Sequence, residues 1–274
     1  MLILIDGHVH IHDCFNIDSF FTSAFENFRF HAKGQGREDS FISVLCLTES
    51  EHDKWFSRLK SCALNQAGHP NKKIYEWKVA TTGESSSLAL KGDRGELVYL
   101  LAGRQIVTSE RLEVLALGTD KRYADGESLI STVESVLRDE AIPVIPWGFG
   151  KWYGKRGRIL KRLIDSHVGH AIYLGDNGGR SSILPYPSHF RLAEARGIRI
   201  LPGSDPLPFP NESSKAGSYG FALFGTIDCA KPASDVKRIL LDPAVQPVPY
   251  GKPETLFRFI RNQCAMQLRK RNSR

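Results

Sequence analysis

The sequence lacks any run of about 20 consecutive apolar residues, the length that a helix needs to span a bilayer, although apolar residues make up 41% of the chain. Its five cysteines are odd in number, widely spaced and without a Cys-x-x-Cys motif, which argues against a disulfide framework and a zinc ribbon. Segment 1–5 has no basic region of the kind that begins a signal peptide. These absences predict a cytoplasmic protein that makes no membrane contact.

The length and composition indicate one large globular domain. The chain has 274 residues, of which 24% are charged, and this size suits a single α/β domain such as a barrel. The formal net charge is +7, and much of the excess lies in residues 151–158 and in the tail from Arg269. A basic balance favours anionic partners, which include phosphate, carboxylate and nucleic acid.

Apolar runs separated by turns give the order of the expected elements. Continuous apolar segments at 1–5 and 41–47 predict buried parallel strands, and short β-prone runs between glycine-containing turns predict antiparallel hairpins over 75–117. After residue 125 the pattern alternates between helices and strands, which is typical of a parallel sheet or a barrel. The helices are expected at 125–137, 157–164, 187–196, 233–240 and 253–268, and the strands at 142–146, 170–174 and 198–201.

The end of the first strand carries a cluster of good metal ligands. The segment reads Asp6-Gly7-His8-Val9-His10-Ile11-His12-Asp13. Side chains two residues apart on a strand share a face, so His8 and His10 predict the start of a transition-metal site. His12 is either a third ligand or a residue that faces the substrate.

A distant aspartate is the best candidate to complete this site. Asp205 follows the strand at 198–201 within Gly203-Ser204-Asp205-Pro206, and functional residues gather at the carboxyl ends of parallel strands. It is expected either to bind the metal or to act as the catalytic base toward a metal-activated water.

Other strand ends supply residues that suit an anionic substrate. Asp176, Asn177 and Arg180 lie in a glycine-rich turn, where glycine allows close approach and arginine can grip carboxylate or phosphate. Lys151 begins a basic stretch at the start of an expected helix, which suits phosphate. Trp147 precedes it, and aromatic residues among basic ones also suit nucleic acid.

The first and last motifs together resemble those of the PHP (polymerase and histidinol phosphatase) superfamily and the related amidohydrolases, which share a first-strand His-x-His and a last-strand aspartate. The stretch 103–118 is similar to the middle of PHP chains. This resemblance implies one domain over 1–274, a single distorted (β/α)7 TIM-like barrel with an antiparallel hairpin insertion. It also implies bound metal ions and hydrolysis of phosphate esters.

The chain departs from the family pattern at several strand ends. The second-strand motif reads Thr48-Glu49-Ser50 instead of Thr-Asp-His, which leaves Glu49 as a weaker candidate ligand. Gln105 falls on a family glutamate, while Leu115 and Trp147 fall on family histidines. These replacements predict a site with fewer metal ions, at which Gln105 and Trp147 contact the substrate.

The leading hypothesis is a metal-dependent hydrolase that acts on a phosphate ester or another small anionic substrate. A divalent ion, Zn, Mn or Fe, is bound by His8, His10 and Asp205. An alternative is a catalytically degenerate barrel that serves as a binding or accessory protein. A third and weaker hypothesis is nucleic-acid binding through the basic loop and tail.

Overall fold

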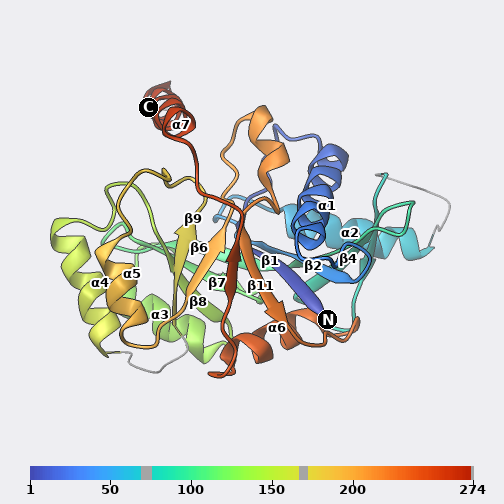
Figure 1. Ribbon diagram of the computed structural model, residues 1–274, viewed down its shortest axis with the longest axis horizontal. Helices are drawn as coiled ribbons and strands as arrows, with labels where there is room; N and C mark the ends of the chain where they lie inside the picture. The colour runs from blue at the N-terminus through green and yellow to red at the C-terminus, as the bar shows by residue number, and fades with distance from the viewer. Residues whose placement is uncertain (69–75, 167–171, 273–274) are drawn as a thin grey trace.

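The computed structural model describes residues 1–68, 76–166 and 172–272, and two mixed β-sheets form its centre (Figure 1). Seven strands form the first sheet, in the spatial order β12 (Val248–Tyr250), β11 (Gly220–Phe224), β1 (Leu2–Val9), β2 (Phe41–Leu47), β5 (Leu97–Leu101), β4 (Ser87–Lys91) and β3 (Lys78–Thr81). Five strands form the second, in the order β10 (Ile200–Gly203), β9 (Tyr173–Asn177), β8 (Ile142–Pro146), β7 (Glu113–Leu117) and β6 (Gly103–Val107).

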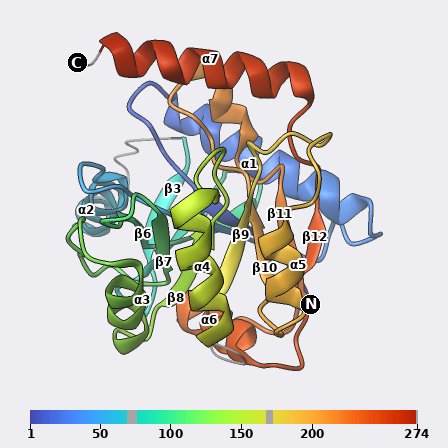
Figure 2. The same ribbon diagram turned by 90° about the vertical axis from the view of Figure 1, so that its left-hand side faces the viewer.

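Helices surround the two sheets (Figures 1 and 2). They are α1 (Ile17–Lys33), α2 (Trp55–Gly68), α3 (Leu129–Arg138), α4 (Gly154–Ser166), α5 (Ser188–Glu194), α6 (Pro232–Leu241), α7 (Leu256–Asn272) and the 3₁₀ helix η1 (Pro210–Lys215). Figure 2 shows α7 lying across the top of the molecule, above α1 and α4. Among the described residues, no helix combines the length and apolarity that crossing a membrane requires.

The prediction of a single (β/α)7 barrel is wrong, because neither sheet closes on itself. The first sheet ends at β12 and β3, and the second ends at β10 and β6. In addition, β7 runs antiparallel to both of its neighbours, and β11 runs antiparallel to β1. Strands joined by tight turns must be antiparallel, so the hairpins cannot take part in a ring of parallel strands.

The expected hairpin insertion is part of both sheets. Strands β3, β4 and β5 pair as an antiparallel meander, and β5 then pairs in parallel with β2 at the centre of the first sheet. The chain passes at Ala102 into β6, the edge strand of the second sheet. The described part of this segment, residues 76–117, therefore links the two sheets and is not an insertion into one of them.

The two sheets approach each other closely at two glycines. A Cβ atom added to Gly203, at the end of β10, would overlap the backbone of His8 in β1. One added to Gly103, at the start of β6, would lie 2.7 Å from the carbonyl oxygen of Ala116 and would also overlap that of Leu47 in β2. The absence of a side chain at both positions lets the edges of the two sheets meet, and this brings the ends of β1 and β10 together.

The expected helices after residue 125 and the strands at 142–146 and 198–201 are confirmed within a few residues. Residue 75 of the first hairpin run and residues 170–171 of an expected strand lie outside the described residues. Sequence reasoning did not assign α1, β11 or β12. The signal for α1 was present, since buried apolar residues recur at helical spacing and the Asn16 side chain accepts a hydrogen bond from the Ser19 amide at 2.9 Å.

Candidate metal centre

Two histidines, an aspartate and a glutamine converge where β1 meets β10. Nε2 of His8 lies 3.0 Å from Nε2 of His10, and Oε1 of Gln105 lies 3.2 Å from each of these nitrogens. Oδ1 of Asp205 lies 3.7 Å from Nε2 of His8 and 3.6 Å from Nε2 of His10. The two motifs that sequence reasoning paired, about 200 residues apart, therefore meet in one place.

This arrangement fits a single bound divalent ion. Within the described residues, the potential ligand atoms of His8, His10 and Asp205 all lie within 4.8 Å of one another. Ligands at typical zinc distances in a tetrahedral site are separated from one another by about 3.3 Å. The observed separations of 3.0 to 3.7 Å bracket this value, so the donor set fits the predicted cofactor.

The electrostatics of the site favour the ligand forms of its residues. Burial and the neighbouring His8 lower the pKa of His10, so its imidazole remains neutral and keeps a lone pair for a metal. Burial alone would raise the pKa of Asp205, but His8 and His10, with Lys215 and a hydrogen bond from Asn177, lower it to about 2. Asp205 is therefore an anion over the whole physiological pH range.

Local contacts fix the orientation of Asp205. The side-chain amide of Asn177 donates a hydrogen bond to Oδ2 of Asp205, which leaves Oδ1 facing the two histidines. The backbone of Asp205 has a φ of 48°, a left-handed conformation that is uncommon outside glycine. Its amide donates to the carbonyl of His8 at 2.8 Å, and this bond holds the strained residue against β1.

Asp6, the first residue of the predicted cluster, has a structural position. Its fully buried carboxylate accepts hydrogen bonds from the Ser204 amide at 2.8 Å, the Ser204 hydroxyl at 2.5 Å and the Gly217 amide at 2.8 Å. Burial raises the pKa of Asp6 to about 6, and these hydrogen bonds oppose the rise. Asp6 thus ties β1 to the segment that carries Asp205.

The two weaker candidate ligands lie beside the cluster and have other partners. Nε2 of His12 lies 3.0 Å from the carbonyl oxygen of Pro206, which can only accept, so this nitrogen carries a proton. Glu49 is buried, its Oε1 accepting from the Phe56 amide at 2.7 Å and its Oε2 from Arg104 at 2.9 Å. Glu49 therefore caps the first turn of α2 with both oxygens engaged.

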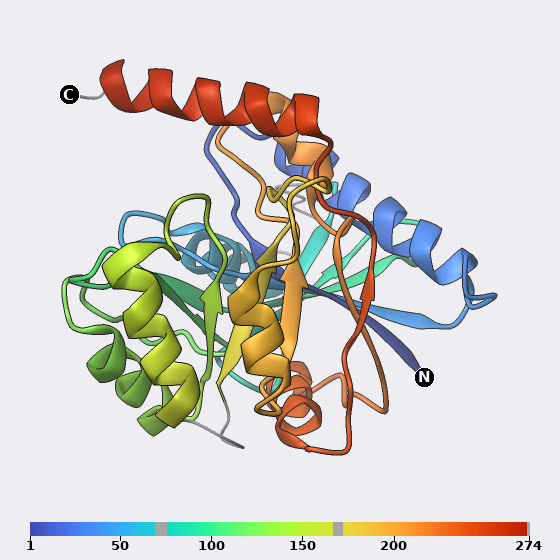
Figure 3. The same cartoon turned by 60° about the vertical axis from the view of Figure 1, so that its left-hand side comes forward.

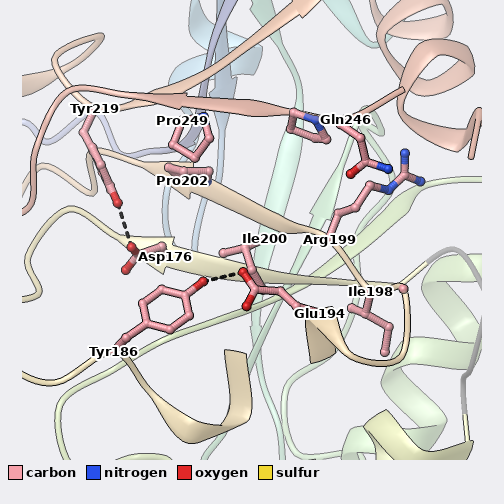
Figure 4. A pocket seen from close by; sticks show the side chains of 12 residues that line it. Asp176, Tyr186, Glu194, Ile198, Arg199, Ile200, Pro202, Tyr219, Gln246 and Pro249 are labelled. Carbon is pink, nitrogen blue, oxygen red and sulfur yellow. Dashed lines mark hydrogen bonds between the residues drawn. The ribbon is translucent and has the colours of Figure 1, made fainter. Parts of the chain in front are cut away.

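Asp176 and Arg180 lie away from the cluster and pair with each other. Arg180 donates two hydrogen bonds of 2.8 Å to Asp176, and the Tyr219 hydroxyl donates a third at 2.6 Å. Figure 4 shows Tyr219 directed at Asp176 on the wall of a cavity of about 510 Å³, with a second hydrogen bond between Tyr186 and Glu194. A substrate role for Asp176 and Arg180 stays a prediction, and one that would require breaking these contacts.

The remaining predicted substrate residues also have partners within the chain. Lys151 forms an ion pair with Glu113. Trp147 is 8% exposed and belongs to the core around α3, α4 and α5. Of all the predicted substrate contacts, Gln105 and Asn177 reach the histidine–aspartate cluster. A role of Gln105 and Asn177 toward substrate stays a prediction. The sequence did not predict their contacts with His8, His10 and Asp205.

No model of a known protein family matches the chain, and no curated protein matches it. Among solved structures, PsfC from Pseudomonas syringae PB-5123 aligns with a TM-score of 0.57 at 16% identity, covering 97% of this chain and 98% of PsfC. This similarity establishes a shared fold. The resemblance to the PHP superfamily stays a prediction. The similarity to PsfC concerns the fold and not the activity.

Two endonuclease structures align more distantly. The lesion-specific endonuclease PfuEndoQ from Pyrococcus furiosus gives a TM-score of 0.49 at 10% identity, and endonuclease Q in complex with a 27-mer duplex substrate gives 0.45 at 12% identity. The alignments cover 92% and 88% of this chain but 59% and 56% of those chains. The prediction of a small anionic substrate, with nucleic acid held unlikely, is not upheld: both of these structures are of endonucleases, and one holds a 27-mer duplex substrate.

Proposed function

We propose that the chain is a metal-dependent hydrolase whose single divalent ion is held by His8, His10 and Asp205. The observation that carries this proposal is the convergence of two imidazole nitrogens and one carboxylate oxygen within 4.8 Å of one another. Buried histidine pairs without a metal are costly, since one ring must donate to the other while both remain desolvated. An ion at this point satisfies all three side chains at once.

Asp205, Asn177 and Gln105 would have different roles around a bound ion. A divalent ion held here would supply Lewis-acid activation of water at neutral pH. Asp205 offers Oδ1 to the ion, while Asn177 holds Oδ2 and fixes the carboxylate plane. Gln105 presents an uncharged oxygen 3.2 Å from both imidazoles, so it can complete the coordination or hold a water in place.

A second candidate is a metal-binding accessory protein that has lost catalysis. It is favoured by one observation, namely that the predicted substrate-gripping residues are engaged elsewhere. Lys151 is paired with Glu113 and Arg180 with Asp176, so neither presents a free cation at the cluster. Both candidates require the same ion, and activity separates them.

The test is hydrolysis by the purified chain after reconstitution with Zn²⁺, Mn²⁺ or Fe²⁺. Bis-p-nitrophenyl phosphate, p-nitrophenyl phosphate and p-nitrophenyl acetate report on three bond classes through the same released phenol. We expect metal-dependent turnover of at least one ester, and a loss of about 100-fold or more in His10→Ala and Asp205→Asn, because catalysis by bound metal is removed.

His52→Ala is the matched control, since His52 is exposed and lies outside the cluster. It should retain wild-type turnover. Metal-dependent turnover that survives in Asp205→Asn would contradict the proposed site. A bound ion without turnover of any ester would favour the accessory protein instead.

A further inference from the structure

Two basic segments of the sequence, residues 149–158 and helix α7, lie together on the surface although about 100 residues separate them. The rings of Phe149 and Phe259 pack edge to face with centroids 5.3 Å apart. This contact joins the loop between β8 and α4 to the first turn of α7. We call the combined surface of 149–158 and α7 the basic-aromatic rim.

The basic-aromatic rim borders the candidate metal centre. Arg269, near the end of α7, donates to the carbonyl of Pro208 at 2.5 Å, three residues beyond Asp205. Before α7 begins, Glu254 pairs at 3.0 Å with Lys215, the same lysine that lowers the pKa of Asp205. Helix α7 thus runs along the segment that continues from the metal ligand, on the side toward which the arrow of β9 points (Figures 1 and 3).

The charge of the rim is almost entirely positive. Neither 149–158 nor 256–272 contains an aspartate or a glutamate. Lys155 and Arg158 are exposed and have no carboxylate partner among the described residues. Arg258 lies 3.2 Å from Glu254, and both Arg258 and Arg261 lie 3.6 Å from the buried Glu212, which offsets part of their charge. A polyanion laid across the rim would therefore meet several cations and no exposed acid of these two segments.

Large aromatic side chains stand among these charges. Phe149 is 56% exposed, Tyr153 is 72% exposed and Phe257 is 77% exposed. Burial of such rings is favourable by a few kcal/mol each, roughly 25 cal/mol per Å², yet more than half of each of the three side chains stays exposed among the described residues. Exposed rings interleaved with cations match the surfaces on which unpaired bases stack while the phosphates are neutralised.

We propose that the basic-aromatic rim binds single-stranded nucleic acid, with bases stacked on Tyr153 and Phe257 and phosphates held by Lys155 and Arg158. A second copy of the chain is a poorer occupant, because two such helices would repel each other. An anionic bilayer is a poorer occupant as well, because it would cover the neighbouring metal centre. That the bound strand is also the substrate rests on the proposed hydrolase; the binding itself does not.

Fluorescence anisotropy of labelled oligothymidine tests the binding on the full chain, in EDTA so that no hydrolysis occurs. Tyr153→Ala and Phe257→Ala should each raise the Kd about tenfold, the usual loss for one stacked base. The double variant Lys155→Gln, Arg158→Gln should lower the slope of log K against log salt by about 1.4, which is about 0.7 for each lost phosphate contact.

Phe30→Ala and Arg94→Gln are matched controls, since Phe30 is 73% exposed on α1 and Arg94 is exposed on the β4–β5 turn. Both should bind like the wild type. The proposal is overturned by an absence of oligonucleotide binding at low salt, by equal losses in Phe30→Ala and Phe257→Ala, or by binding to phosphatidylserine vesicles alone. Because the assay contains no metal, failure here leaves the hydrolase standing, and loss of metal in His8→Ala leaves this result unchanged.

Discussion

At the scale of single residues, the site shows which polar groups are free to act and which hold the fold. Asp6 and Glu49 are buried acids that satisfy backbone amides, as buried carboxylates must. His8, His10 and Asp205 instead point at one another. A sequence motif alone does not distinguish a structural acid such as Asp6 or Glu49 from a candidate metal ligand such as Asp205. The difference lies in the hydrogen-bond donors that surround each carboxylate.

Gln105 should control the affinity of the site for metal. Its Oε1 lies 3.2 Å from both imidazole nitrogens, so Gln105→Glu places a negative charge beside the ion. We expect the Kd for Zn²⁺ to fall about tenfold or more, since one added charge at this distance contributes on the order of 1 kcal/mol or more. Calorimetric titration measures this, with Gln105→Ala as the control that should weaken binding. An unchanged affinity in Gln105→Glu would place the ion elsewhere.

Asp176 and Arg180 should matter for stability and not for metal binding. Removing one partner of a buried, doubly hydrogen-bonded pair leaves an uncompensated charge, so Arg180→Ala should lower the free energy of unfolding by about 3–5 kcal/mol. Urea denaturation measures the loss. The double variant Asp176→Leu, Arg180→Met should lose much less, because neither charge is left buried. Wild-type stability in Arg180→Ala would contradict a structural role of this ion pair and would favour the predicted role of Arg180 in substrate binding.

At the scale of secondary-structure elements, the site depends on how the ends of β1 and β10 meet. Strand ends were predictable, because apolar runs and the polar residues after them mark where each strand stops. This is why His8, His10 and Asp205 could be paired from sequence. The antiparallel pairing of β7 with β8 and the existence of β11 and β12 were not predictable in the same way, since pairing partners depend on contacts across the whole chain.

The junction at Gly203 gives a test of this arrangement. A Cβ atom there would overlap the backbone of His8, so Gly203→Ala should separate β10 from β1. We expect a loss of about 1–3 kcal/mol or more in unfolding free energy, together with weaker metal binding. Gly34→Ala is the control, because Gly34 has helical dihedrals and its added Cβ would meet ordinary contacts of 3.4 Å. Equal stability of the two variants would contradict the close approach.

At the scale of the whole molecule, the open pair of sheets replaces the expected ring of strands. The parallel run β8–β9–β10 followed from the alternation of helices and strands. The sequence predicted that the hairpins β3–β4–β5 and β6–β7 are antiparallel. It did not predict that these hairpins carry the chain from one sheet to the other. Turn chemistry reveals a hairpin locally, whereas its place in a sheet is decided by packing among distant segments.

Metal binding should stabilise the whole fold, because the ligands come from both sheets. A ligand that binds only the folded chain at 100 times its Kd adds about 2.7 kcal/mol, which for a chain of this size corresponds to a rise in Tm of about 5 °C. Differential scanning fluorimetry of chelator-stripped protein with and without Mn²⁺ measures this shift. Asp205→Asn should show little of it, and a full shift in that variant would assign the stabilisation to another site.

Binding of one ion by His8, His10 and Asp205 is best tested by the stoichiometry of divalent metal in purified protein, measured by elemental analysis after reconstitution with Zn²⁺ and removal of free ion. We expect one ion per chain in the wild type and almost none in His8→Ala, His10→Ala and Asp205→Asn, with His52→Ala unchanged. No retained metal in the wild type, or equal metal in the four variants, would contradict it.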